Sequence, residues 1–335
     1  MHAGSHFRIR TFLYWTRRNI LWLTILAVIP TVLYALLDFH WLAIPWQPVA
    51  LVGTAAAFIA GFKNTQTYNR SWEARKIWGA IINDSRTWGL MVKDFIVKEN
   101  ITKEELHPIH KRIIYRHFAW LTALRFQLRK PEAWENTNKS YFKEFRKHYS
   151  VPEWETNLED IMRPFLTEKD LQYVLKKKNR ATQLLSLQSA DLRELRGEKL
   201  IDAYPYVSLE GLLKEFFTHQ GKAERIKKFP YPRQFASINM FFIRLFSLLL
   251  PFGMLDEFAQ LGDYGVWLTI PFSVLVGWVF TSLEQVGEST ENPFEGGAND
   301  IPMAALSRTI EIDLREMLEE TDLPPAVTPV NEILM

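Results

Sequence analysis

Residues 19–37, NILWLTILAVIPTVLYALL, contain no acidic or basic side chain. An uncharged apolar stretch of about 20 residues is what a helix needs to cross the hydrocarbon core of a bilayer. Residues 41–62 and 264–283 form two more such stretches, and residues 236–255 form a fourth that carries one charge, Arg244. The sequence therefore predicts an all-α integral membrane protein with four transmembrane helices.

The single arginine in the predicted third span restricts how that helix can face its surroundings. A cationic side chain exposed to lipid at mid-membrane costs about 2.5–3.5 kcal/mol on insertion scales. We therefore expect Arg244 to face protein, water or the lipid headgroups.

Basic residues next to the spans predict the orientation, because Lys and Arg in short flanks are retained on the cytoplasmic side. Residues 1–18 hold four arginines and no acid, Lys63 follows the second span, and the predicted outer loops carry no Lys or Arg. One flank disagrees, since Glu284 and Glu288 follow the fourth span. We expect a multi-pass protein of the inner (plasma) membrane with both termini in the cytoplasm.

Composition along the chain predicts its organisation. No proline occurs in residues 63–96, so the second span is expected to continue as one helix. Thr102 and Glu105 form a capping-box pair that predicts a helix to about Leu128. The expected segments are a cytosolic N-terminal segment (1–18), spans one and two (19–62), a cytosolic helical domain (63–235), spans three and four (236–283), and a cytosolic C-terminal helix and tail (284–335).

Shorter elements are predicted from proline and asparagine positions and from amphipathic stretches. Two prolines and three asparagines in residues 130–157 indicate turns around one short helix. An amphipathic stretch predicts a helix over residues 208–220. Asn299 or Asp300 can cap a last helix over residues 301–320, and the prolines beyond it predict a loose tail.

Several classes of function are disfavoured by what the chain lacks. The 40 basic and 38 acidic residues nearly balance, so the net charge gives no argument for nucleic-acid binding. With no cysteine, disulfides, thiolate nucleophiles and cysteine-ligated zinc are excluded. No phosphate-binding loop, dinucleotide fingerprint or metalloprotease motif occurs. We therefore expect no enzyme, no cofactor and no metal site, with a site at His107, His110 and His117 as the minor alternative.

The second span has an unusual composition in its C-terminal half. Small residues fill most of positions 53–61, and Phe58 and Phe62 are four residues apart, which places both rings on one helix face. Small residues in a span usually allow close helix packing, and phenylalanine usually faces lipid or core. Taken alone, the pattern leaves helix packing and a pore lining open.

Sequence motifs give the chain a resemblance to a known family. FIAGF at 58–62, followed by Asn64 and by YNRSWEARKIWG at 68–79, resembles the bestrophin family and specifically its prokaryotic branch. Similar motifs recur near the last two spans and the helix after them: PF at 251–252, EQVGE at 284–288, NPF at 292–294, NDIP at 299–302 and RTIE at 308–311.

The resemblance implies an ion channel that assembles as a homopentamer, with the second span of every subunit lining a narrow apolar neck. Carried onto this sequence, the neck residues would be Thr54, Phe58 and Phe62, with Gly61 permitting close approach. Rings of phenyl groups can close an ion path by dewetting. A second, cytosolic constriction would lie near Tyr204, Pro205 and Val207. The implied partners are small inorganic ions, the lipid bilayer and further copies of the chain.

Two departures from the family pattern matter. Calcium-gated members carry a run of acids after Asn-Pro-Phe, and calcium needs about six to eight oxygen ligands. This chain has EGGAND at 295–300, so we expect neither a calcium clasp nor calcium activation. Thr54 is polar where an aliphatic residue is often found. An uncharged neck offers no fixed charge, so chloride and monovalent cations both remain open.

Two other classes of function compete with a channel. A membrane-anchored helical scaffold or sensor would use the large cytosolic domain to bind a partner. A secondary transporter would need broken helices and a polar site at the midplane, where this sequence offers Thr54 and Arg244.

Overall fold

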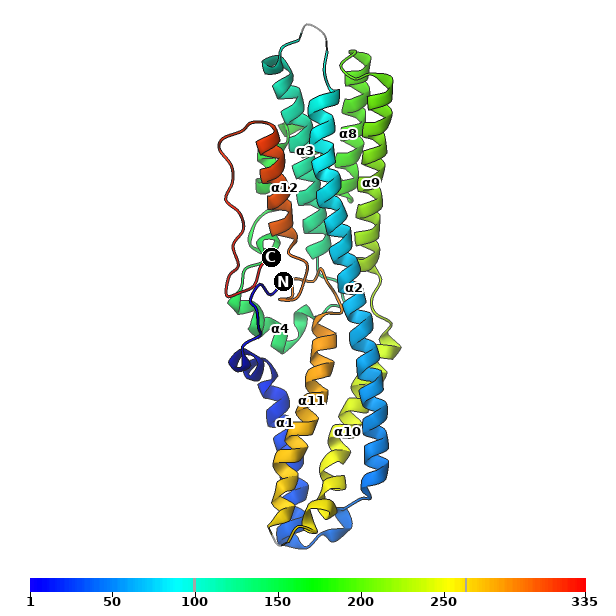
Figure 1. The fold of residues 1–335 in the computed structure, drawn as a ribbon, viewed down its shortest axis with the longest axis vertical. Coiled ribbons are helices and arrows are strands. Elements are labelled where there is room, and N and C mark those ends of the chain that lie inside the picture. Colours follow the sequence, from blue (N-terminus) through cyan, green and yellow to red (C-terminus); the bar gives the residue numbers. More distant parts are fainter. Residues whose placement is uncertain (99–100, 263) are drawn as a thin grey trace. The chain divides into compact units, whose positions relative to one another are not determined.

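The computed structural model describes residues 1–98, 101–262 and 264–335 (Figure 1). Within these ranges all regular elements are helices, and β pairing is limited to isolated bridges at His2, Val330 and Ile333. Contacts divide the chain into two compact units. The membrane unit comprises Gly4–Arg70 and Pro230–Glu291, and the polar unit comprises Met1–Ala3, Ser71–Phe229 and Asn292–Met335.

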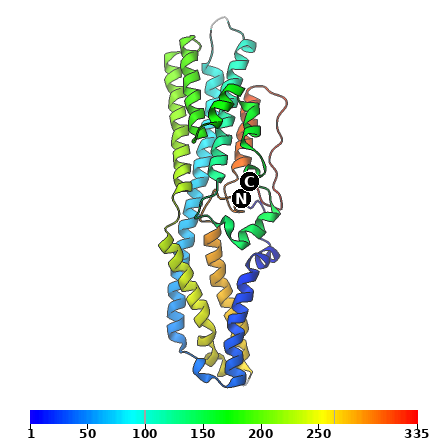
Figure 2. The same cartoon turned by 180° about the vertical axis from the view of Figure 1, so that it is seen from behind.

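Four helices form the membrane unit, and each is long and apolar enough to cross a bilayer. Figures 1 and 2 show them side by side, with α1 at one flank, α2 at the other, and α10 and α11 between. The predicted all-α fold with four spans is confirmed. The elements are α1 (Ile9–Leu37), the first half of α2 (Trp46–Phe95), α10 (Arg233–Ala259), α11 (Thr269–Ser289), and the 3₁₀ turns η1 (His40–Leu42) and η5 (Gly265–Leu268).

The second span is part of one long helix. α2 runs unbroken for 50 residues, about 75 Å at 1.5 Å per residue. This length confirms that the helix continues past residue 62, and it follows from the absence of proline after Pro48. α2 therefore contributes its first half to the membrane unit and its second half to the polar unit.

The polar unit is a helical bundle around buried aromatic side chains. Trp78 and Trp88 of α2, Trp120 of α3 and Phe216 of α9 are all fully buried in one core cluster. The capping box of Thr102 and Glu105 forms as predicted, and α3 ends at Arg129. The long elements are α3 (Lys103–Arg129), α8 (Arg180–Gly197), α9 (Ala203–Lys228) and α12 (Met303–Met317).

Short elements connect α3 to α8. Irregular turns are found over residues 130–157 as predicted, although two short helices form there instead of one. The elements are η2 (Asn136–Asn138), α4 (Ser140–Phe145), η3 (Arg146–His148), α5 (Pro152–Glu155), α6 (Leu158–Met162), η4 (Arg163–Phe165) and α7 (Glu168–Leu175).

Three predictions about the ends of elements are wrong. α9 begins at Ala203 and not at residue 208, because Pro205 lies in the first turn, where a missing N–H costs nothing. α12 begins after Pro302, and the Asp300 carboxylate accepts from the Gly296 N–H at 2.7 Å instead of capping that helix. The tail is not loose at its end. Ile333 is buried, and the Leu334 N–H donates to the Met1 carbonyl at 2.9 Å.

Candidate functional site

One face of the α2 span is packed against its neighbours in the membrane unit. Buried residues recur every three or four positions, as expected for one helix face. The packing is close at Gly53, where an added Cβ would lie 2.6 Å from the Phe246 ring of α10. Small residues thus serve helix packing here. The buried positions are Val49, Gly53, Ala56, Ala60, Lys63 and Thr67.

The other face of this span is uncovered. Phe58 is 78% exposed and Phe62 is 49% exposed, with the Phe62 ring centroid 6.5 Å from that of Phe235. Thr54 is also exposed, and its hydroxyl donates to the Ala50 carbonyl at 2.9 Å. The three residues predicted for the neck therefore share one open, uncharged face. We call Thr54, Phe58 and Phe62 the open face of α2.

Gly61 lies on the open side of the helix as well. Apart from the adjoining backbone of α2 itself, no atom of the described residues lies within 4 Å of where its Cβ would be, in contrast to Gly53. Any close approach at Gly61 therefore has to involve something other than this chain's described residues.

A buried ion pair holds α2 at the end of the open face. Lys63 directly follows Phe62, and its Nζ lies 2.7 Å from the Glu284 carboxylate of α11. Asn239 of α10 donates to the other oxygen of that carboxylate. In the sequence, Lys63 and Glu284 stand as separate flanking charges, and no local pattern indicates that they meet. Glu284, an exception to the charge rule, is neutralised by Lys63.

Arg244 lies on the exposed side of α10. Its neighbours Phe241 and Leu245 are exposed too, so this part of α10 presents a mixed cationic and apolar surface. The prediction that Arg244 faces protein, water or headgroups remains a prediction for the protein in a bilayer.

The residues proposed for the cytosolic constriction lie in the first turns of α9. Tyr204 is 89% exposed, Val207 is 67% exposed, and Pro205 is half-buried. Their three-residue spacing places Tyr204 and Val207 on one side of the helix. The structure thus brings them to one exposed surface of the polar unit.

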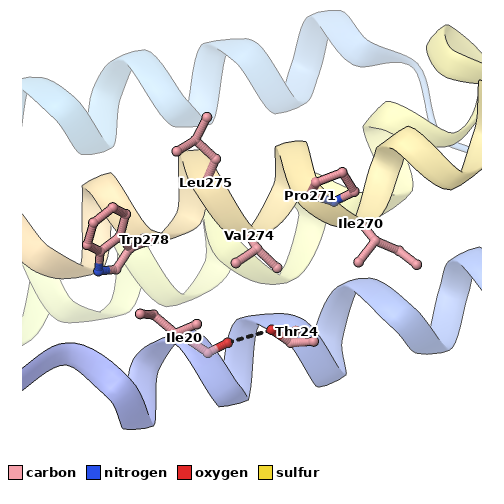
Figure 3. A pocket seen from close by; sticks show the side chains of 7 residues that line it. All are labelled: Ile20, Thr24, Ile270, Pro271, Val274, Leu275 and Trp278. Carbon is pink, nitrogen blue, oxygen red and sulfur yellow. Dashed lines mark hydrogen bonds between the residues drawn. The ribbon is translucent and has the colours of Figure 1, made fainter. Parts of the chain in front are cut away.

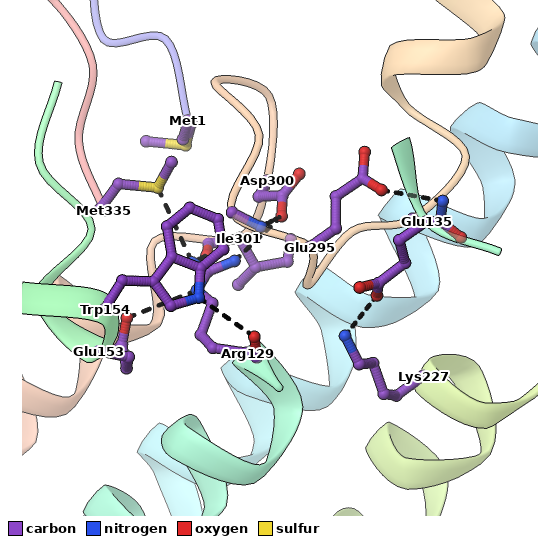
Figure 4. Close-up of polar contacts among 12 residues, drawn as sticks. Met1, Arg129, Glu135, Glu153, Trp154, Lys227, Glu295, Asp300, Ile301 and Met335 are labelled. Carbon is purple, nitrogen blue, oxygen red and sulfur yellow. Dashed lines mark hydrogen bonds and ion pairs between the residues drawn. The ribbon is translucent and has the colours of Figure 1, made fainter. Parts of the chain in front are cut away.

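A buried charge network surrounds the segment that follows the Asn-Pro-Phe motif (Figure 4). Arg129 is 1% exposed and pairs with Asp300 at 3.0 Å and with Glu153 at 3.5 Å. Lys227 pairs with Glu135 in the same region. Each of these carboxylates therefore has a cationic partner in the protein.

Glu295 is the carboxyl group of this network that has no cationic partner among the described ion pairs. One of its oxygens accepts from the Asn136 N–H at 2.9 Å and from the Asn292 side chain at 3.0 Å, and the other has no hydrogen-bond partner. Burial, followed by the charge of nearby Asp300, raises the pKa of Glu295 to about 8. Burial of Glu295 therefore favours its neutral, protonated form over the carboxylate that a cation would need.

The three histidines of the alternative metal site do not converge. His110 Nε2 lies 2.8 Å from the Ile96 carbonyl, and His117 Nε2 lies 2.8 Å from Ser85 Oγ. Complete burial lowers the pKa of His117 to about 3. Across the part of the chain that the structure describes, no three His, Cys, Asp or Glu side chains gather as a metal ion would need.

Fold and site define a multi-span helical membrane protein whose α2 span leaves the uncharged face of Thr54, Phe58 and Phe62 uncovered. A family model described as bacterial and fungal bestrophin protein matches residues 13–316, so the chain belongs to the bestrophin family. Members of this family are ion channels, and the chain is a bestrophin-type ion channel and not an enzyme.

Individual relatives support this assignment. The chain is 27% identical over 283 residues to a voltage-dependent anion channel-forming protein of Escherichia coli K12, covering 84% of this chain and 80% of the relative. It is 26% identical over 332 residues to a voltage-dependent anion channel-forming protein of Ralstonia nicotianae, covering 94% of this chain and 95% of the relative. A crystal structure of a bacterial bestrophin homologue from Klebsiella pneumoniae is similar, with a TM-score of 0.73, 25% identity, and coverage of 92% and 99%.

Proposed function

We propose that the chain forms a homopentameric channel for small inorganic anions such as chloride, with the open face of α2 lining its neck. The observation that carries the proposal is that Thr54, Phe58 and Phe62 lie together, exposed and uncharged, on one side of a membrane helix. A single subunit cannot enclose a path. Copies arranged around an axis would turn this face inward and remove the rings from lipid.

The chemistry of the open face fits a gate. Phenyl rings around a narrow path exclude water, and a small rotation of each helix would admit it. The ring edges carry the positive end of the aromatic quadrupole, which favours an anion over a cation. The relatives named as anion channel-forming proteins support the same sign of charge.

The remaining expectations complete this proposal. The channel lies in the plasma membrane with both termini in the cytoplasm, which agrees with the four arginines before the first span. The exposed surface of Tyr204, Pro205 and Val207 forms a second constriction in the cytosolic part of each subunit. Thr54 supplies a hydroxyl to the neck, which makes that end less apolar than the two phenylalanine positions.

Single-channel currents in planar bilayers under a salt gradient test the proposal. The native protein should conduct with a reversal potential of anion sign, and Phe58→Ala combined with Phe62→Ala should raise conductance or open probability. Phe272→Ala on α11 is a matched control, because Phe272 is 45% exposed but lies on another helix. A cation-sign reversal potential would refute the anion assignment, and equal effects of both variants would refute the neck.

A further inference from the structure

A groove runs between α1 and α11, at the flank of the membrane unit that lies away from α2 (Figure 3). Its volume is about 420 Å³, within the range of about 300–1,000 Å³ typical of ligand sites. Ile20 and Thr24 of α1 form one wall, and Ile270, Val274 and Trp278 of α11 contribute to the other. The open face of α2 and this groove thus use different helices.

The side chains that line the groove have no free hydrogen-bond donor for a polar ligand. The Thr24 hydroxyl donates to the Ile20 carbonyl at 2.9 Å, and Trp278 Nε1 donates to the Thr16 hydroxyl at 2.9 Å. A polar molecule would lose its water here without regaining hydrogen bonds, whereas a hydrocarbon chain would lose nothing. The lining therefore favours an apolar occupant.

Close packing beside the groove keeps its walls apart at a fixed spacing. Leu23 of α1 is 3% exposed, and one of its methyl carbons lies 2.6 Å from where a Cβ on Gly277 would be. Because this contact leaves no room for the helices to approach further, the groove cannot close by a small shift of α1 toward α11.

Two arginines of α1 lie beyond the end of the groove, on the same face of the helix. Arg10, Arg17, Ile20 and Thr24 are separated by seven, three and four positions, which places them along one face of α1. The guanidinium of Arg17 stacks on the Tyr14 ring at 3.8 Å. These arginines precede the uncharged stretch that begins at residue 19, so they lie at the level of the lipid headgroups.

We propose that this groove binds one acyl chain of an anionic phospholipid, whose phosphate contacts Arg10 and Arg17. Guanidinium groups recognise phosphate through paired, charge-assisted hydrogen bonds. Basic clusters beside membrane helices bind acidic headgroups in the same way. The proposal needs only that α1 and α11 cross the bilayer, so it stands or falls separately from the pore assignment.

Quenching of tryptophan fluorescence by brominated lipid tests the site, because Trp278 lines the groove. Protein in phosphatidylcholine vesicles is titrated with chain-brominated phosphatidylglycerol, and the Trp278 signal is the difference between native protein and Trp278→Phe. Arg10→Gln with Arg17→Gln should raise the fraction needed for half-maximal quenching about fivefold or more. Arg8→Gln with Arg18→Gln removes the same charge away from this face and should change it little.

A second measurement does not depend on the arginine variants. Native mass spectrometry should count fewer retained phosphatidylglycerol molecules per subunit for Val274→Phe, which fills the groove and leaves the charges in place.

Brominated phosphatidylcholine quenching Trp278 as strongly as brominated phosphatidylglycerol would overturn the headgroup assignment. Equal lipid counts for the native protein and Val274→Phe would overturn the groove as the binding place.

Discussion

Lys63 Nζ lies 2.7 Å from Glu284 Oε1, and Lys63 is only 3% exposed. The pair joins α2 to α11 immediately after Phe62, and Asn239 of α10 completes it. A rotation of α2 that turns its phenyl rings therefore has to move or break a buried ion pair. This contact therefore opposes the rotation of α2 that is proposed to open the neck.

Removal of one partner should strongly destabilise the subunit. Lys63→Met leaves the Glu284 carboxylate buried without its counter-charge, which typically costs about 3–5 kcal/mol. Replacement of both residues by Met should recover much of this loss, because no charge is left unpaired. Thermal unfolding of the detergent-solubilised protein measures both. A single variant as stable as the native protein would show that the pair is not formed.

Substitutions at two glycines of α2 should have opposite effects: one should lower subunit stability, and the other should lower conductance. Gly53→Val places a side chain against Phe246 and should cost about 1–3 kcal/mol through overpacking. A Cβ at Gly61 would have no neighbouring side chain or other helix of the described chain within 4 Å, so Gly61→Val should leave subunit stability nearly unchanged while conductance falls. Unfolding and current recordings separate these effects. A Gly61→Val channel with native conductance would argue against a narrow path at this level.

The hydroxyl of Thr54 should ease wetting of the neck. Thr54→Val keeps the shape of the side chain and removes its one polar group, so the neck becomes apolar at all three positions of the open face. We expect a lower open probability with unchanged subunit stability. Single-channel recording and thermal unfolding provide the two readouts, and an unaltered open probability would place Thr54 outside the gate.

Stability should depend on pH through Glu295. Its pKa rises from 4.5 to about 8 on folding because of burial, so the native state holds a proton that the unfolded state releases. The free energy of unfolding should therefore fall as pH rises from about 4.5 to about 8. Glu295→Gln keeps the neutral shape and should flatten this slope. Melting temperatures of the native protein and Glu295→Gln between pH 5 and pH 8.5 test this prediction. Parallel curves of melting temperature against pH would contradict it.

The sequence predicts the parts of this fold that depend on local patterns. Charge-free stretches identify the four spans, the capping box of Thr102 and Glu105 locates the start of α3, and four-residue spacing places Phe58 and Phe62 on one face. Each of these features is determined by residues close together in the chain. They can therefore be predicted without a three-dimensional structure.

Contacts between distant positions were not predictable in this way. Lys63 and Glu284 are 221 positions apart, and Arg129 and Asp300 are 171 apart. No local pattern indicates that either pair meets. The local pattern predicts that Asn299 or Asp300 caps the last helix, but Asp300 pairs with Arg129 and neither residue is the cap. The buried end of the tail was missed for the same reason.

The open face of α2 is proposed to border the ion path, and because the chain contains no cysteine, single introduced thiols can test this directly. Phe58→Cys introduces the only thiol, and Phe272→Cys on α11 serves as the control. A charged, water-soluble methanethiosulfonate reagent should reduce the current through Phe58→Cys channels and leave Phe272→Cys and native channels unchanged. If Phe58→Cys channels conduct and their current is unaffected by the reagent, residue 58 does not line the path and the open face of α2 is not the neck.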